Sequence, residues 1–223
     1  MIAPGRAPRQ HAPMSRTPVV YVVDDDASVR RSLELLIDSA GWHALAFASA
    51  QAFLSRAPVP APSCLVLDVT LPDLNGLELQ RRLAAERIQM PIIFISAHGD
   101  VPMTVRAMKA GAMEFLTKPL VAEALLNAIT LAIERSAAAL AEEAAMRSLH
   151  ECHDSLTCRE REVMALVVCG LLNKQIAAEL DISEITVKAH RGSMMRKMKA
   201  NSVAHLVNMA AKLCIPYGEP AHI

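Results

Sequence analysis

Three aspartates, Asp24, Asp25 and Asp26, follow directly after the apolar segment VVYVV. Adjacent carboxylates repel one another, and near a folded core each loses hydration free energy unless a cation or a hydrogen-bond donor compensates it. The sequence therefore predicts a positive group close to these acids. Carboxylate oxygens are hard ligands, so a Mg²⁺ ion that keeps several of its waters is a suitable cation.

Three more polar side chains follow apolar segments in the same way. Asp68 ends CLVLD, Ser96 ends IIFIS, and Lys118 stands just after MEFL. In an open parallel sheet, ligands bind beyond the carboxyl ends of the strands, where the strand order reverses. We therefore expect these groups to meet the acids at one edge of a sheet. A lysine and a hydroxyl beside carboxylates suit a phosphoryl group better than a second metal ion.

The elements that must position these groups alternate along the chain. Five apolar segments, from VVYVV to MEFL, alternate with five segments of helical character. This alternation predicts an α/β doubly wound domain with a five-stranded parallel sheet. The last helical segment, LVAEALLNAITLAIERSAAALAEEAAMRSLHE, has no glycine or proline and is rich in strong helix formers. We expect one helix, with its first half packed on the sheet and its second half connecting two domains.

After Asp154 the pattern contains only helices. Four segments have helical character: CREREVMALVVCG, NKQIAAELD, EITVKAHRGSMMRKMKA and SVAHLVNMAAKLC. Thr157 and Glu160 have the spacing of a capping box, and Ser183 and Ser202 are suitable N-caps. The second and third segments are joined by the short turn DIS, as in a helix-turn-helix motif. The sequence predicts an all-α second domain of four helices.

The overall composition is that of a globular protein. Apolar residues make up 52% of the chain against 21% charged residues, and the formal net charge is zero. Total charge therefore indicates neither nucleic acid nor membrane binding. The five cysteines are an odd number without a CxxC pair, which favours a cytoplasmic location over a disulfide framework. No apolar run approaches the ~20 residues that span a bilayer, so we expect no membrane partner.

The first domain resembles the receiver domain of bacterial two-component response regulators. The resemblance rests on DDD, LDVTLPDLNG and ISAHGDVPMTVRAMKAGAMEFLTKP, and HGDVPMTVRAMKAGA resembles the FixJ branch of the NarL/FixJ family. It implies a flavodoxin-like strand order of 2-1-3-4-5. It also implies that Asp68 is the phosphoacceptor, that Ser96 and Lys118 bond the phosphoryl group, and that Phe115 is the switch aromatic. The implied Mg²⁺ ligands are Asp24, Asp25, Asp68 and the backbone carbonyl of Thr70.

The same resemblance implies a phosphoacceptor protein rather than an enzyme. Its own chemistry would be limited to Mg²⁺-dependent self-phosphorylation and slow autodephosphorylation. Phosphorylation adds up to about two negative charges, which can draw Ser96 inward and let Phe115 turn into the space behind it. The expected result is a rearranged face of VPMTVRAMKA and MEFL that pairs two molecules. Pro119 implies a cis bond after Lys118.

The second domain resembles a LuxR-type helix-turn-helix domain, through LTCREREV, NKQIAAEL and TVKAHRGSMMRKM. The resemblance implies that Lys188 and Ala189 face base edges, and chemistry adds Arg191, since arginine pairs well with guanine. The last helix would be the dimerising surface on DNA. Gly192 stands where a relative can have a long side chain, which leaves the recognised sequence open. The expected phosphate contacts are Thr186, Asn173, Lys174, Arg196 and Lys197.

These expectations define a cytoplasmic response regulator with a histidine kinase, double-stranded promoter DNA and RNA polymerase as partners. It would form a homodimer on phosphorylation. The expected division is a disordered tail at 1–16, in which Met14 is an alternative start, a receiver at 17–136, a helical linker at 137–153, the LuxR-type domain at 154–216 and a tail at 217–223.

Alternative functions remain at this point. One is a phosphorylation-independent transcription factor that uses its receiver only to dimerise. Another is a ligand-sensing LuxR-type regulator, although the first half shows no pattern of an aromatic-lined cavity. A haloacid-dehalogenase-type phosphatase would need an aspartate where Thr70 stands. His150, Cys152, His153 and Cys158 could be drawn as a metal site, but their spacing matches no common zinc pattern.

Overall fold

The structure is a computed structural model that describes residues 17–57, 59–86, 88–97 and 99–215. The predicted tails at 1–16 and 217–223 lie outside these residues. The chain forms two compact units, Met1–Leu140 and Ala141–Ile223. The first contains the sheet, and the second contains the helices that follow Asp154.

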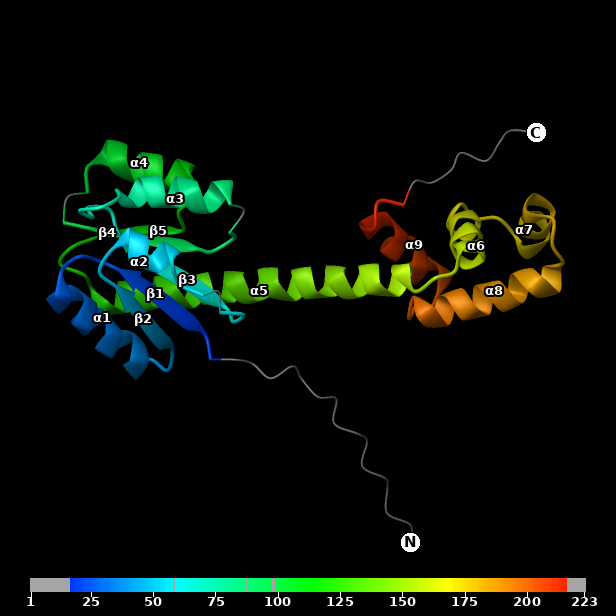
Figure 1. Cartoon of the computed structure of the whole chain (residues 1–223), viewed down its shortest axis with the longest axis horizontal. Coiled ribbons are helices and arrows are strands. Elements are labelled where there is room, and N and C mark those ends of the chain that lie inside the picture. Colours follow the sequence, from blue (N-terminus) through cyan, green and yellow to red (C-terminus); the bar gives the residue numbers. More distant parts are fainter. Residues whose placement is uncertain (1–16, 58, 87, 98, 216–223) are drawn as a thin grey trace, which may run out of the picture. The chain divides into compact units, whose positions relative to one another are not determined.

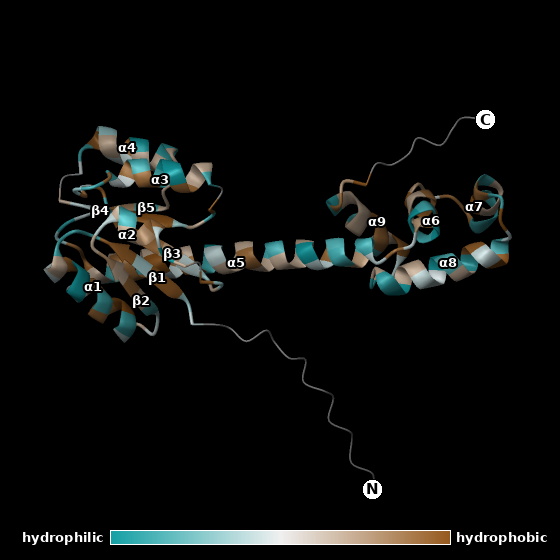
Figure 2. Ribbon diagram, viewed as in Figure 1, coloured by the Kyte–Doolittle hydropathy of each residue, from teal (hydrophilic) through white to brown (hydrophobic). Residues whose placement is uncertain are grey.

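The first unit contains the predicted five-stranded parallel sheet. Its strands are β1 (Val19–Val23), β2 (His43–Phe47), β3 (Ser63–Asp68), β4 (Ile92–Ser96) and β5 (Glu114–Thr117). The order is β2-β1-β3-β4-β5, with every pair parallel, as predicted (Figure 1). Every residue of β1, β3 and β4 is buried, because helices cover both faces of the central strands. This burial explains their near-continuous apolar sequences, coloured brown in Figure 2.

Helices lie on both faces of this sheet (Figure 1). The helices of this unit are α1 (Ala27–Ser39), α2 (Ala50–Leu54), α3 (Gly76–Ala85), α4 (Val101–Lys109) and α5 (Ala122–Asp154). On one face, α1 and α5 pack through Leu33, Ile37 and Ile129. On the other face, α2, α3 and α4 pack around Tyr21 and Phe94. The alternation of strands and helices thus gives three layers, as predicted.

Aspartates outside the acidic cluster serve as helix caps. Asp26 Oδ1 accepts a hydrogen bond from the Ser28 backbone N–H at 2.7 Å and caps α1. Asp100 caps α4 in the same way, and the Asp73 carboxylate accepts backbone N–H groups at the start of α2. A carboxylate at a helix amino-terminus satisfies otherwise unpaired donors. One of the three adjacent acids, Asp26, therefore has a structural role.

The long helix α5 is continuous from Ala122 to Asp154, as predicted. Leu125, Ile129 and Ile133 are buried against the sheet, whereas Leu140 is exposed. By length and composition, α5 is apolar enough to cross a membrane, contrary to the expectation from apolar run length. Composition alone is weak evidence, because the apolar side chains of its first half already pack in a protein core.

The second unit is formed by α6 (Cys158–Val168), α7 (Asn173–Leu180), α8 (Glu184–Lys197), α9 (Val203–Lys212) and the end of α5. Thr157 and Glu160 form the predicted capping box, and Ser183 and Ser202 cap α8 and α9. Leu149 of α5 lies in the core of this unit, so the folded part begins before Asp154.

The histidines and cysteines that were considered as a metal site from the sequence do not form one. Within the part of the chain that the structure describes, His150, Cys152, His153 and Cys158 make no cluster that could hold an ion. None of the five cysteines forms a disulfide bond.

Candidate functional site

Three carboxylates converge beyond the carboxyl ends of β1 and β3. One oxygen from each of Asp24, Asp25 and Asp68 lies within 4.8 Å of the others. Asp24 is completely buried and Asp68 is 5% exposed, whereas Asp25 is exposed. The sequence thus predicted correctly that acids far apart along the chain would meet at one edge of the sheet.

The predicted positive group is Lys118. Its Nζ donates hydrogen bonds to Asp24 Oδ2 at 2.7 Å and to Asp68 Oδ2 at 2.6 Å. The backbone N–H of Lys118 donates to the Ser96 carbonyl at 2.8 Å, which fixes the lysine beside the end of β4. Ser96 follows Ile95, the residue that pairs with Asp68 in the sheet, and it is buried. Asp24, Asp68, Ser96 and Lys118 therefore lie at the carboxyl ends of four strands of the sheet.

The pKa values reflect this crowding. Burial raises the pKa of Asp24, and the hydrogen bonds from Lys118 and from the Asp26 backbone only partly offset that effect. Burial also disfavours the charged form of Lys118, yet its hydrogen bonds to Asp24 and Asp68 raise its pKa above the ordinary value. The ammonium form of Lys118 is therefore a stable part of the site.

The charge balance leaves room for a divalent cation. Three carboxylates surround one ammonium group, so negative charge exceeds positive charge at this edge. Asp25 is the acid that Lys118 does not contact among the described residues, and it is accessible to solvent. Oxygen donors with excess negative charge suit a hard ion such as Mg²⁺. The residues present thus fit the metal that the sequence implied.

Asp68, the phosphoacceptor candidate, is held in place by the loop that follows β3. The Thr70 backbone N–H donates to Asp68 Oδ1 at 2.9 Å, while Lys118 holds the other oxygen. Gly76, at the start of α3, lies against this loop, and its N–H donates to the Val69 carbonyl at 2.9 Å. A Cβ at Gly76 would lie 2.5 Å from the Asp68 carbonyl oxygen. Only glycine permits this approach of α3 to the strand end.

Phe115, the predicted switch aromatic, lies partly buried on β5. Its ring centroid is 6.2 Å from that of Phe94 on the neighbouring strand. The adjacent helix α4 exposes three apolar side chains, Val101, Val105 and Met108. The face formed by α4 and β5 thus contains both Phe115, which is near the site, and an exposed apolar surface.

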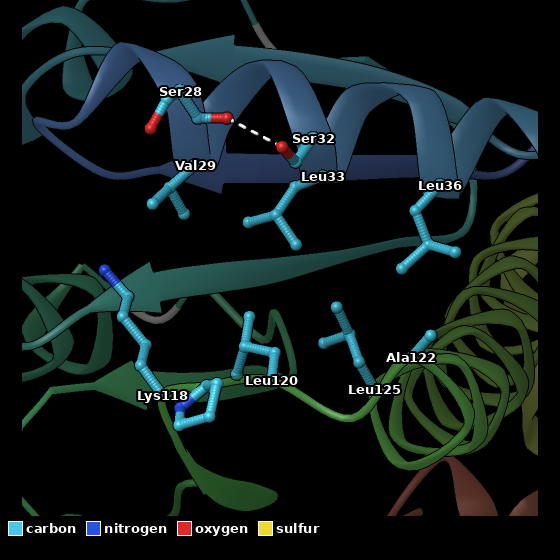
Figure 3. A pocket seen from close by; sticks show the side chains of 10 residues that line it. Ser28, Val29, Ser32, Leu33, Leu36, Lys118, Leu120, Ala122 and Leu125 are labelled. Carbon is cyan, nitrogen blue, oxygen red and sulfur yellow. Dashed lines mark hydrogen bonds between the residues drawn. The ribbon is translucent and has the colours of Figure 1, made fainter.

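An apolar groove opens beside Lys118 (Figure 3). It has a volume of about 300 Å³ and separates α1 from the start of α5. Val29, Leu33 and Leu36 point into it from α1, and Leu120 lies opposite (Figure 3). Any large phosphodonor that approaches the acidic cluster from this side meets an apolar surface.

In the second unit, α7, a short turn and α8 form the predicted helix-turn-helix. α7 ends at Asp181, whose φ of 51° is the left-handed conformation that stops a helix. On α8, Val187 and Met194 are completely buried.

The opposite face of α8 is exposed. It presents Lys188 and Ala189, together with Ile185, whose side chain is 79% exposed. The spacing of i, i+3 and i+4 places these three residues on one stripe. Ile185 was missed from the sequence, although its position three residues before Lys188 was a usable signal.

Some predicted DNA contacts bond to other protein groups. Arg191 Nη1 donates to Asn173 Oδ1 at 2.9 Å, so these two residues link α7 to α8. Thr186 Oγ1 lies 2.8 Å from Ser183 Oγ at the start of α8. Lys174 and Arg196 are exposed.

Lys197 and Glu160 form an ion pair between α8 and α6. Lys197 Nζ donates to the buried Glu160 Oε2 at 2.6 Å. Hydrogen bonds from Lys197, from Ser193 and from the Thr157 backbone lower the pKa of Glu160 to about 2. Glu160 thus joins α6 to α8 as well as capping α6.

Comparisons with known proteins match both units of the chain. Residues 20–130 match the response regulator receiver domain, and residues 154–210 match the luxR family of bacterial regulatory proteins. Nodulation protein W of Bradyrhizobium diazoefficiens is 48% identical over 205 residues, covering 92% of this chain and 90% of that protein. Transcriptional regulatory protein FixJ of Rhizobium meliloti is 44% identical over 191 residues, covering 86% and 94%. The solved structure of the response regulator StyR has 47% identity and a TM-score of 0.82, covering 88% of this chain and 100% of that one.

A receiver joined to a luxR-type domain defines a DNA-binding transcriptional response regulator of a two-component system. The chain belongs to the NarL/FixJ family of these regulators. Its receiver implies a histidine kinase as partner, and its luxR-type domain implies DNA.

Proposed function

We propose that Asp68 is the residue that accepts the phosphoryl group from the histidine kinase. The observation that supports this assignment is the Lys118 ammonium group, which bonds both Asp68 and Asp24. An Asp68 carboxylate oxygen attacks the phosphorus of the phosphohistidine in line. A new O–P bond forms while the N–P bond breaks and its electron pair returns to the imidazole. The product is an acyl phosphate, and Lys118 neutralises charge that develops on the transferred group.

The Mg²⁺ ligands in this proposal are Asp24, Asp25, Asp68 and the backbone carbonyl of Thr70. A Mg²⁺ ion held by these residues would neutralise part of the negative charge at the site during the transfer. The chain is then a phosphoacceptor whose own chemistry is limited to self-phosphorylation and slow loss of the phosphoryl group. Ser96 bonds a phosphoryl oxygen from the end of β4.

The output of phosphorylation is dimerisation through the face of α4 and β5. Ser96 moves toward the added charge, and Phe115 turns into the space behind it. Because Val101, Val105 and Met108 are exposed on α4, pairing of two receivers would bury apolar surface. The paired chains then bind a promoter element with two-fold symmetry in the cytoplasm, where RNA polymerase acts.

The DNA contacts divide by their surroundings. We assign Lys188, Ala189 and Ile185 to base edges, with the apolar side chains against thymine methyl groups. Thr186, Lys174 and Arg196 contact phosphates. Arg191 and Asn173 position α7 against α8 through their hydrogen bond, and Lys197 positions α8 through Glu160.

The rival reading, a transcription factor that ignores phosphorylation, is not favoured. It gives no reason for a partly buried lysine between two buried acids at the strand ends. Removing the Lys118 ammonium group and two carboxylates from water costs desolvation free energy. A role of these charges in phosphoryl transfer explains why the chain retains them.

The assignment is tested by incubating the protein with acetyl phosphate and Mg²⁺. Intact-mass spectrometry should show one added phosphoryl group on the wild type and none on Asp68→Asn. Asp73→Asn is the matched control, because Asp73 belongs to the same loop region but only caps α2. It should be labelled like the wild type. Equal labelling of Asp68→Asn and wild type would refute the assignment.

A metal arm accompanies this experiment. Asp25 is exposed, and it forms no ion pair with Lys118 among the described residues, so Asp25→Asn should fold normally. Labelling of this variant should need a higher Mg²⁺ concentration than labelling of the wild type. An unchanged Mg²⁺ dependence would remove Asp25 from the ligand set.

A further inference from the structure

The chain leaves α8 through an unusual backbone conformation. Lys199, the residue after the C-cap Met198, has a φ of 54°, in the left-handed region that residues with a Cβ disfavour. The Lys199 N–H donates to the Arg196 carbonyl at 3.1 Å, and the Ala200 N–H donates to the Met195 carbonyl at 3.0 Å. These two hydrogen bonds form a Schellman motif, which satisfies carbonyl groups at the end of a helix.

Glycine usually takes the left-handed position of this motif, because it has no Cβ. The same pair of hydrogen bonds closes α1, α4 and α6, where the chain places Gly41, Gly111 and Gly170 with φ of 88°, 93° and 88°. After α8 the chain places lysine and accepts the steric cost. The motif is held by its backbone hydrogen bonds and by Ala200 and Met195, which pack on the core of the second unit. The fold itself therefore gives no reason for a side chain at this position.

The helix dipole does not explain the lysine either. Cations near the carboxyl end of a helix stabilise it, and the effect falls off within the last turn. The last turn of α8 already contains Arg196 and Lys197, which both have ordinary helical backbone. A third cation, placed beyond the C-cap in a disfavoured conformation, adds little to this stabilisation.

The Lys199 side chain is available to a partner outside the chain. It is exposed, and no carboxylate in the described part of the chain lies within ion-pair distance of its ammonium group. Two other cations of α8 bond groups of the protein itself, because Lys197 pairs with Glu160 and Arg191 bonds Asn173. Lys199 thus adds a positive charge that no protein group neutralises at the carboxyl end of this helix.

The place of Lys199 along α8 indicates which part of the DNA it meets. It follows Lys188 by about three helical turns, so the two positions lie almost in line along the helix. At ~1.5 Å per residue they are about 16 Å apart along the axis. The major groove is about 12 Å wide, and a recognition helix contacts base edges through its amino-terminal residues. When Lys188 lies at the base edges, Lys199 is therefore close to the sugar-phosphate backbone.

We propose that Lys199 binds a phosphate of the DNA backbone, beside the contact assigned to Arg196. This inference rests on the proposed function of α8 as the helix that contacts DNA. The Lys199 ammonium group donates to a phosphate oxygen as a point charge on a flexible stem. Phosphates are the same at every base pair, so the contact adds affinity without adding sequence preference. The lysine thus lowers the stability of the second unit and raises its affinity for DNA.

The variant Lys199→Gly tests this role, because the two effects have opposite signs. Glycine fits the left-handed backbone, so the urea midpoint of the second unit should rise. The affinity for DNA should fall by about fivefold for each bound chain at ~0.1 M salt, and the slope of log affinity against log salt should become shallower by about 0.9. Fluorescence anisotropy measures both on the full chain treated with acetyl phosphate and Mg²⁺. The probes are a duplex that the wild type selects from a random library and a duplex of shuffled sequence.

Two further variants serve as controls. Lys199→Arg keeps the charge and should keep the wild-type salt slope. Arg159→Gln removes an exposed cation of α6 that is paired with Glu162, and it should change neither the affinity nor the slope.

Three results for Lys199→Gly would overturn the inference: wild-type affinity and slope on both duplexes, a lowered urea midpoint, or a loss of affinity confined to the selected duplex. The last result would mean that Lys199 contacts a base. A wild type that binds neither duplex would instead refute the proposed function, and this inference with it.

Discussion

Two lysines illustrate how single residues use buried carboxylates in this protein. Lys118 bonds both Asp24 and Asp68. One ammonium group cannot neutralise two carboxylates, so part of their negative charge is available to bind another cation. Among the described residues, the ion-pair partner of Lys197 is Glu160, which is also part of the capping box at the start of α6. Removing one partner of a buried pair leaves an uncompensated charge, which is more costly than removing an exposed one. The first arrangement suits chemistry, and the second suits stability.

Glu160 should make the stability of the second unit depend on pH. Its pKa in the folded state is about 2, below the ordinary value of 4.5. The carboxylate therefore contributes stability that is complete above pH 4.5 and is lost as the pH falls toward about 2. We expect Glu160→Gln, which keeps the capping hydrogen bonds, to lower the free energy of unfolding by up to about 2 kcal/mol near neutral pH. The Lys197 side chain is 35% exposed, so solvent screening limits this value.

Urea unfolding followed by circular dichroism measures this effect at several pH values. The difference between wild type and Glu160→Gln should narrow as the pH is lowered from 4.5. Glu162→Gln is the control, because Glu162 forms a half-exposed pair with Arg159. It should cost less than about 1 kcal/mol at every pH. A constant difference for Glu160→Gln would show that the ion pair is not its cause.

Among the elements, α8 has two faces with different roles. Its buried face holds Val187 and Met194 in the core, and its exposed face presents Lys188 and Ile185. A side chain that contacts a base edge discriminates between sequences, whereas one that contacts a phosphate does not. Substitutions on the exposed face should therefore fall into two classes: those that change the preferred DNA sequence, and those that weaken binding to all sequences.

We expect Lys188→Ala to relax the preference at one base position, at a cost of about 1–3 kcal/mol on the preferred site. Arg196→Ala should instead weaken binding to all sequences and reduce the salt dependence by about one phosphate contact. Selection from a random DNA library gives the preferred site of the wild type, and titrations at several salt concentrations then compare the variants. The same uniform loss for both variants would contradict this division.

The elements themselves were predictable from the sequence because their signals are local. Apolar runs bounded by polar residues gave the strands, and Thr157, Ser183 and Ser202 marked helix starts at the observed positions. The meeting of Asp24 with Asp68 was also predictable, since parallel strands bring their carboxyl ends to one edge.

Contacts between elements were less predictable. The hydrogen bond between Arg191 and Asn173 depends on how α7 packs on α8, and the sequence alone does not fix side-chain directions across a turn. The hydrogen bond from Gln80 of α3 to the Ala107 carbonyl of α4 likewise appears only when both helices are in place. A cavity around the amino end of β4 has no pattern in the sequence, because its walls come from four separate segments.

For the whole molecule, phosphorylation should change the oligomeric state. In the proposed function, the exposed apolar side chains of α4, which are tolerated in a monomer, would form the interface once the neighbouring β5 is rearranged. Sedimentation velocity should show that acetyl phosphate and Mg²⁺ shift the wild type from monomer toward dimer. Val105→Glu should remain monomeric although it is still labelled.

Leu35→Glu is the control for this substitution, because Leu35 is also an exposed apolar residue but lies on α1. It should dimerise like the wild type. The labelled wild type should bind a promoter fragment with two half-sites more tightly than the unlabelled protein. A labelled wild type that stays monomeric would exclude dimerisation as the output.

The close approach at Gly76 has a consequence for how this protein tolerates mutation. Gly76 has no functional group, yet any side chain there would collide with the main chain at the end of β3. A saturation scan that selects for promoter activation should therefore find this position as intolerant as Asp68 itself. The two positions would separate only in a screen for folded protein, where Asp68 variants survive and Gly76 variants do not.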